Sequence, residues 1–163
     1  MEDKDMTEQT TATPLLSQLL TSWITGEESE GFPLANLANA AAILYENLAT
    51  VNWAGFYLYD HEQDELILGP FLGKPAVVRI KPGSGVVGQA YESQETITVD
   101  DVHQHAGHIA CDSASNAEIV VPLTRENGEK IGVIDIDSIT FNRFTDQDKA
   151  DLEHFAQTLL PYI

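Results

Sequence analysis

Two hairpin patterns in the middle of the chain, with helical patterns on either side, limit the available folds more than any other feature. Residues 52–68 and residues 118–137 each combine two apolar, strand-like runs around a polar turn. The second turn contains Asn127 and Gly128, a pair typical of a tight hairpin. Because hairpins outnumber crossover connections, we expect an α+β fold in which helices cover a mainly antiparallel sheet.

Helical patterns precede and follow these hairpins. Thr13 and Pro14 predict a helix that threonine caps and proline begins, with leucines recurring at helical spacing after them. Pro33 opens a second helical pattern, and Thr145 followed by Asp148 resembles a capping box at the start of the last helix. The apolar stripes of the first two helices are expected to face the core or a dimer interface.

The segments between the two hairpins are shorter. Gly69 and Pro70 are expected to end the second strand of the first hairpin, since glycine and proline interrupt regular structure. Residues 76–80 and 95–99 predict two more strands, and residues 86–92 predict a short helix between them.

Length, charge and cysteine content narrow the functional classes. The 163 residues fit one domain, and we expect a disordered acidic tail over residues 1–12 and a single domain over residues 13–163. A net charge of −18 argues against binding to nucleic acid or to anionic membranes, because phosphate-rich partners require basic residues. A single cysteine fits a reducing compartment, and no leader or membrane-spanning run is recognisable, so we expect a cytoplasmic protein.

Cys111, the only cysteine, lies in a long irregular connection over residues 100–116. It has no second thiol with which to form an internal disulfide, so it is either an inert, buried apolar side chain or a nucleophile. The polar turn at residues 112–116 favours the nucleophile, because solvent and backbone N–H groups stabilise a thiolate. Long connections in compact domains are also more often functional than structural.

Asp135 and Asp137 are two residues apart on a predicted strand, so their side chains share one face. They mark either a solvated strand end or a polar pocket. The hairpin turn can bring Glu118 close to both. Three carboxylates in one cavity repel one another, so at least one is expected to hold a proton near neutral pH. A thiol beside a protonated acid combines a nucleophile with a proton donor.

Trp53 and Tyr57 share a face of their strand, with Gly55 between them. Such a pair is most often part of a core. If that face lines the same cavity as the carboxylates, the pair forms an aromatic wall for an apolar or cationic group, and Gly55 leaves space for it.

The imidazoles of His103, His105 and His108 near Cys111 raise the possibility of a metal site. Their spacing matches no zinc pattern, and the chain has no second cysteine. No phosphate-binding loop and no serine-hydrolase elbow is present either. We therefore expect neither a metal nor a cofactor.

Six motifs follow one another along the chain: NWAGFY (52–57), LGPF (68–71), GKPA (73–76), GHIACD (107–112), EIVVPL (118–123) and IGVIDIDS (131–138). Together they resemble the free methionine-(R)-sulfoxide reductases, which are small single-domain GAF proteins. The resemblance runs from the first helix to the last. It implies a GAF domain, with a mainly antiparallel sheet of about six strands sandwiched between helices.

The resemblance also implies a function, the reduction of free L-methionine (R)-sulfoxide to L-methionine. Cys111 matches the attacking cysteine of the family. The pocket carboxylates of the family hold the amino group of the substrate and help to protonate the sulfoxide oxygen, and its aromatic residues surround the methyl end. The residues implied for catalysis are Cys111, Glu118 and Asp137, and those implied for substrate binding are Trp53, Tyr57, Glu118, Asp135 and Asp137.

One departure from the family concerns its other two cysteines, whose positions are occupied here by Val77 and Val87. Without a resolving thiol, a sulfenic acid on Cys111 must be reduced by an external thiol, either a low-molecular-weight thiol or a thioredoxin-like protein. A homodimer is also implied by the resemblance.

Two other readings of the sequence remain open at this point. One is a non-catalytic GAF module that binds or senses a molecule similar to methionine sulfoxide, since a fold does not settle a function. The other is a metal-binding or purely structural protein.

Overall fold

The structure, a computed structural model, describes residues 12–26, 28–107 and 112–163. Cys111 and most of the predicted acidic tail therefore lie outside the described residues. The elements are α1 (Leu15–Ile24), α2 (Pro33–Asn47), β1 (Val51–Asp60), β2 (Glu65–Leu72), β3 (Arg79–Ile80), α3 (Gly85–Ser93), β4 (Ile97–Val99), η1 (Val102–Gln104), β5 (Ala117–Thr124), β6 (Lys130–Ser138), α4 (Asp146–Leu159) and η2 (Leu160–Tyr162), where η marks a 3₁₀ turn.

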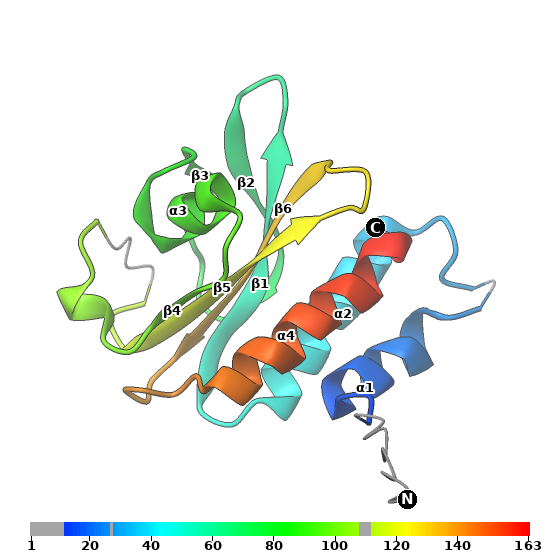
Figure 1. The fold of residues 1–163 in the computed structure, drawn as a ribbon, viewed down its shortest axis with the longest axis horizontal. Helices are drawn as coiled ribbons and strands as arrows, with labels where there is room; N and C mark the ends of the chain where they lie inside the picture. Colours follow the sequence, from blue (N-terminus) through cyan, green and yellow to red (C-terminus); the bar gives the residue numbers. More distant parts are fainter. Residues whose placement is uncertain (1–11, 27, 108–111) are drawn as a thin grey trace, which may run out of the picture.

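The six strands in the described part of the chain form one sheet, in the order β3-β2-β1-β6-β5-β4. Every neighbouring pair is antiparallel, which confirms the predicted α+β fold with a six-stranded sheet (Figure 1). The first predicted hairpin is β1 with β2, and the second is β5 with β6. Because β1 also pairs with β6, the two hairpins join at the centre of the sheet, and side chains from β1, β6 and β5 form rows across it.

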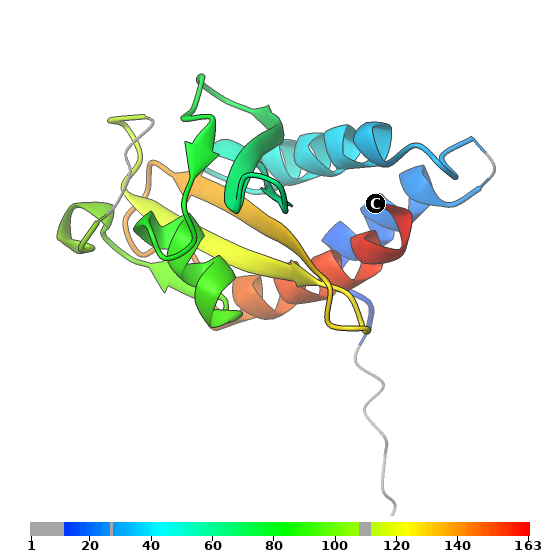
Figure 2. The same cartoon turned by 90° about the horizontal axis from the view of Figure 1, so that it is seen from above.

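Helices cover both faces of this sheet, as the two views show (Figures 1 and 2). On one face α1, α2 and α4 enclose the larger core, in which Leu20 and Phe155 are buried together with Phe56 of β1. On the other face α3 encloses a smaller core that contains Tyr57 of β1 and Val133 of β6. The alternation of side chains along β1 therefore divides its residues between two cores.

Two of the three predicted helix starts are confirmed. The α2 helix begins at Pro33, and α4 begins with the predicted capping box. In that box Thr145 Oγ1 accepts a bond of 3.1 Å from the N–H of Asp148, and Asp148 Oδ2 accepts one of 2.8 Å from the N–H of Thr145. These two bonds satisfy donors that the first turn of a helix otherwise leaves unpaired.

The predicted threonine cap of the first helix is wrong. Pro14 is the N-cap of α1, and no side chain makes a capping hydrogen bond there. The carbonyl of Pro14 accepts the first helical bond, from the N–H of Gln18, whereas the carbonyl of Thr13 accepts a bond from the Gln18 side chain. Pro14 therefore occupies the N-cap position, one residue before the first helical position that was predicted for it.

The strand that was expected to end at Gly69 and Pro70 continues through both to Leu72, so that prediction is wrong. The outer neighbour β3 pairs with β2 only at Leu66 and Ile67. Pro70 lies across from the point where the register between β1 and β2 shifts, between Gly55 and Tyr57, and irregularities of this kind are where a sheet tolerates proline.

Two other predicted strands are shorter than expected. The strand predicted over 76–80 is confined to Arg79–Ile80, and the one predicted over 95–99 begins only at Ile97. Residues 73–78 run outside the sheet. Two of their carbonyls, those of Lys74 and Val77, accept hydrogen bonds from side chains of β1 instead of from a neighbouring strand. In the described part of the chain, no helix combines the length and hydrophobicity needed to cross a bilayer.

Candidate functional site

A row of three side chains crosses the centre of the sheet. Asp137 of β6 pairs with Trp53 of β1 on one side and with Glu118 of β5 on the other. Residues directly opposite one another in antiparallel strands point to the same face, so all three point toward α3. Asp135 lies two residues before Asp137 and therefore shares this face, where its partner on β1 is Gly55.

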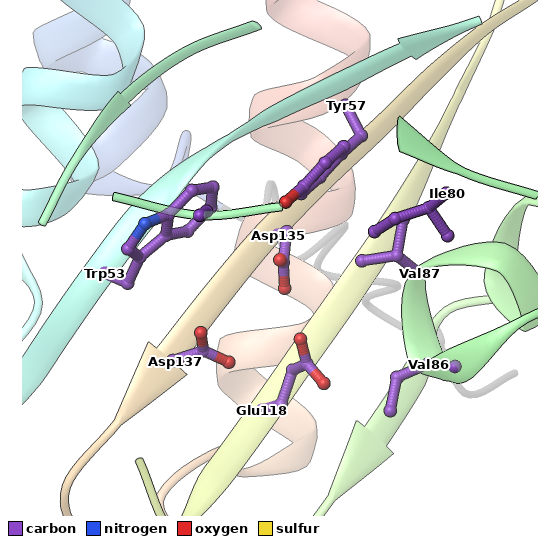
Figure 3. Close-up of a pocket in the computed structure, with 10 residues that line it drawn as sticks. Trp53, Tyr57, Ile80, Val86, Val87, Glu118, Asp135 and Asp137 are labelled. Carbon is purple, nitrogen blue, oxygen red and sulfur yellow. The ribbon is translucent and has the colours of Figure 1, made fainter. Parts of the chain in front are cut away.

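These side chains line a small pocket between the sheet and α3 (Figure 3). The carboxyl groups meet at the sheet side, and Ile80, Val86 and Val87 lie across from them. The structure brings five of the six predicted site residues into this pocket, and the sixth, Cys111, lies outside the described residues. The five are Trp53, Tyr57, Glu118, Asp135 and Asp137.

The three carboxyl groups of Glu118, Asp135 and Asp137, here called the acid cluster, are removed from solvent. Glu118 and Asp135 are each only 5% exposed. Burial is the main cause that raises the pKa of each of the three groups well above its ordinary value, because an apolar environment disfavours the charged form. Repulsion within the cluster raises the pKa of each group further. The alternative of a solvated strand end therefore does not describe Asp135.

Contacts within the acid cluster indicate that it holds a proton. Glu118 is within hydrogen-bond reach of both Asp135 and Asp137. Two carboxyl groups share a hydrogen bond only when one of them is protonated. The buried Oδ1 atoms of Asp135 and Asp137 have no partner among the described residues. Buried acceptors without partners are costly, and a ligand that carries several N–H donors would satisfy them.

Aromatic rings form a second wall of the pocket. The Trp53 ring stacks on Phe71, with centroids 5.1 Å apart and planes at 13°, and on Tyr57 at 6.1 Å and 21°. This stack depends on Gly55, because a Cβ at Gly55 would lie 2.3 Å from the Cβ of Phe71. The sequence patterns did not single out Phe71, although it lies in the LGPF motif.

Asp112, the residue after Cys111 in the sequence, lies near the acid cluster. Its Oδ1 accepts a bond of 2.9 Å from the N–H of Ala114 and lies 3.5 Å from Lys74 Nζ. The bond from Ala114 is the largest of the contacts that hold the pKa of Asp112 below its ordinary value. The charge of Asp112 in turn contributes to the raised pKa of Asp137.

The acid cluster also has the geometry of a possible cation site. One oxygen from each of its three residues lies within 4.8 Å of the others, the one such group found in the described parts of the chain. An all-oxygen set of this kind suits hard cations rather than zinc.

The imidazole site considered from the sequence can be judged only in part. His103 Nε2 lies 2.9 Å from Asn116 Oδ1, and His105 Nε2 lies 3.0 Å from Gln89 Oε1, so the Nε2 atom of each ring has an amide partner. His108 lies outside the described residues, as does Cys111. The expectation that the protein binds no metal stays a prediction.

The antiparallel sheet, with helices on both faces and a pocket beside α3, defines a class of domain. A model of the GAF domain family matches residues 35–160. The chain therefore belongs to the GAF domain family, as the motifs predicted.

Individual relatives narrow this class further. The "Free methionine-R-sulfoxide reductase" of Escherichia coli is 54% identical over 126 residues, which are 77% of this chain and 74% of that protein. The Saccharomyces cerevisiae protein of the same name is 42% identical over 150 residues, or 89% and 83% of the two chains. A solved structure of fRMsr from Staphylococcus aureus in complex with its substrate is 46% identical, with a TM-score of 0.82 over 91% of this chain and 93% of that one. The chain is thus a homologue of the free methionine-R-sulfoxide reductases.

Proposed function

We propose that this protein reduces free L-methionine (R)-sulfoxide to L-methionine. The observation that carries the proposal is the buried acid cluster with unfilled oxygens, in a chain 54% identical to a protein named for this activity. A free amino acid has an ammonium group with three N–H donors, whereas the same nitrogen within a protein chain has one. The unfilled oxygens of Asp135 and Asp137 therefore favour a free amino acid over a peptide.

The pocket offers different surroundings to the two ends of such a substrate. The ammonium group would lie against the acid cluster, where its positive charge offsets the repulsion among the carboxylates. The methyl end would lie against the rings of Trp53 and Tyr57, which provide an apolar surface. Between these ends the sulfoxide oxygen would lie within reach of a protonated carboxyl of the cluster.

In the reaction we propose, the Cys111 thiolate attacks the sulfoxide sulfur while Glu118 or Asp137 donates a proton to the oxygen. The attack joins Cys111 Sγ to the substrate sulfur, and the protonated oxygen takes up a second proton and leaves that sulfur as water. Water then attacks Cys111 Sγ and gives up a proton, the sulfur–sulfur bond breaks, methionine leaves, and Cys111 is left as a sulfenic acid. The substrate sulfur gains two electrons and the cysteine sulfur loses two. Support for the position of Cys111 comes from its neighbour Asp112, whose charge acts on Asp137.

An external thiol would complete the cycle. It attacks the sulfenic acid, releases water and forms a mixed disulfide, which a second thiol reduces to regenerate Cys111. Val77 and Val87 stand at the other cysteine positions of the family, and Val87 is a buried part of the pocket wall. A low-molecular-weight thiol or a thioredoxin-like protein is therefore the proposed reductant, and such chemistry requires a reducing compartment such as the cytoplasm.

A product assay on the two separated diastereomers of free methionine sulfoxide tests the function. The wild-type protein with a thiol reductant should consume the R form alone, and Cys111→Ser should consume neither. Without reductant, a single turnover should give one methionine per chain and a sulfenic acid that a dimedone probe labels. If the wild type forms no methionine, the proposal is wrong. Equal binding of methionine sulfoxide by both forms, without product, would then identify a sensor.

A homodimer is the proposed assembly. Its support is the exposure of large apolar side chains on two helices: Leu15 is 66% and Trp23 65% exposed on α1, and Leu34 is 71% exposed on α2. Large exposed apolar surfaces are typical of protein–protein contacts. Light scattering after size-exclusion chromatography should give twice the chain mass, and Trp23→Glu should shift it toward the monomer. A monomeric wild type at micromolar concentration would contradict the proposal.

A further inference from the structure

The segment that joins β2 to β3, residues 73–78, runs beside the aromatic wall of the pocket. Ala76 of this segment lines the pocket. At its start Gly73 has φ of +132° and lies against the Trp53 ring, where a Cβ would be 2.5 Å from Trp53 Cδ1. At its end the carbonyl of Val78 accepts a bond of 2.9 Å from the N–H of Leu68 in β2. The segment therefore forms part of the pocket while running outside the sheet.

Between these two ends the segment is held by the side chains of the aromatic wall. Trp53 Nε1 donates to the carbonyl of Lys74 at 3.0 Å, and the Tyr57 hydroxyl donates to the carbonyl of Val77 at 2.9 Å. Both aromatic residues are at least 98% buried. Each of these side chains has one polar hydrogen, and each hydrogen is used in the bond to the segment.

This arrangement restricts what the two aromatic residues can do in the proposed reaction. While these bonds hold, neither side chain has a second polar hydrogen to donate to a sulfoxide oxygen, which agrees with the acid cluster as the proposed proton donor. Their rings line the pocket and can contact a ligand, while their polar atoms hold the segment of residues 73–78 in place.

We infer that Tyr57 and Trp53 are positioning residues that hold the β2–β3 segment closed over the substrate. This inference rests on the proposed function. They act on the affinity for substrate, because a displaced segment opens the pocket at Ala76 without moving the acid cluster on β5 and β6. The rate of the chemical step, once substrate is bound, depends on the cluster and not on the two donors.

The matched variants Tyr57→Phe and Tyr59→Phe test this inference. Each loses one phenol hydroxyl from the same face of β1, but the Tyr59 hydroxyl donates to Asp64 in the exposed hairpin turn. Loss of one hydrogen bond, with a carbonyl left unpaired, predicts a KM about five- to tenfold higher for Tyr57→Phe and a kcat within about twofold of wild type. Tyr59→Phe should leave both constants unchanged.

A second measurement follows the segment itself. Thermolysin cleaves before apolar residues such as Val77 and Val78, so cleavage within residues 73–80 should be several-fold faster in Tyr57→Phe than in wild type or Tyr59→Phe. A lower kcat at unchanged KM would overturn the inference, because the hydroxyl would then act on the reacting atoms. Unchanged KM with unchanged cleavage would overturn it as well.

Two further outcomes also decide the question. If Tyr57→Phe does not fold, Trp53→Phe removes the other donor and is subject to the same two criteria. If the wild type reduces neither diastereomer, the proposed function fails, whereas the cleavage rates still show whether the aromatic donors hold the segment.

Discussion

Replacing Asp135 with asparagine should stabilise the ligand-free protein, and increasingly so as the pH rises. The carboxyl oxygens of the acid cluster lie within 4.8 Å of one another. Two unit charges at that separation repel by about 3.5 kcal/mol at an effective dielectric constant of about 20. Each ionised pair therefore costs about this much, and Asp135→Asn removes two of the three possible pairs.

The pH dependence follows from the raised pKa of Asp135, which is caused first by burial and then by the charge of Glu118. Above the unfolded pKa of about 4, the folded protein holds a proton that the unfolded chain releases. The free energy of unfolding of the wild type therefore falls with rising pH, by about 1.4 kcal/mol per unit for each such proton, until the folded pKa is passed. Asparagine has no such proton, so the variant should not lose this stability.

Urea denaturation at pH 5, 6, 7 and 8 measures this difference. From pH 5 upward the advantage of Asp135→Asn should widen by about 1.4 kcal/mol for each pH unit over which the folded wild type keeps the proton, and each kcal/mol corresponds to roughly 2–4 °C in Tm for a domain of this size. Glu62→Gln, in the exposed turn after β1, is the control and should follow the wild-type curve. Parallel curves for Asp135→Asn and wild type, or a variant less stable at pH 8, would refute the reasoning.

Two further predictions concern stability. Gly55→Ala places a Cβ 2.3 Å from the Cβ of Phe71 and 2.8 Å from its Cα, and backbone in the middle of a sheet cannot move away cheaply. The cost should be about 1–3 kcal/mol in urea denaturation, and a change below about 0.5 kcal/mol would contradict the observed packing. Thr145→Ala removes one half of the capping box of α4 and should cost about 1 kcal/mol, seen as a Tm lower by about 2–4 °C. Turnover should be unchanged, and an unchanged Tm would argue against the cap.

Features of the site that depend on local chemistry could be predicted from the sequence. Asn127 and Gly128 set the hairpin turn, and the period of two along β6 places Asp135 and Asp137 on one face. The turn then carries Glu118 to its position opposite Asp137. The acid cluster is therefore recoverable from local signals and strand periodicity alone.

Features that depend on distant partners could not be predicted in this way. Pro70 stays within β2 at the point where the register with β1 shifts, and this irregularity depends on the pairing of the two strands rather than on the LGPF motif alone. Residues 76–78 have a strand-like composition, yet Tyr57 binds the carbonyl of Val77 and the strand is reduced to Arg79–Ile80. The role of Cys111 stays a prediction, since that residue lies outside the described part of the chain.

The two outermost strands of the sheet have a consequence for how copies of this protein meet. β3 contains two residues and β4 contains three, so each of these outermost strands offers few unpaired backbone groups to a neighbouring molecule. Short outermost strands of this kind discourage strand-to-strand stacking into fibrils. For the proposed homodimer, the short outermost strands favour an interface on the helical side, where side chains rather than backbone ladders determine which surfaces recognise each other.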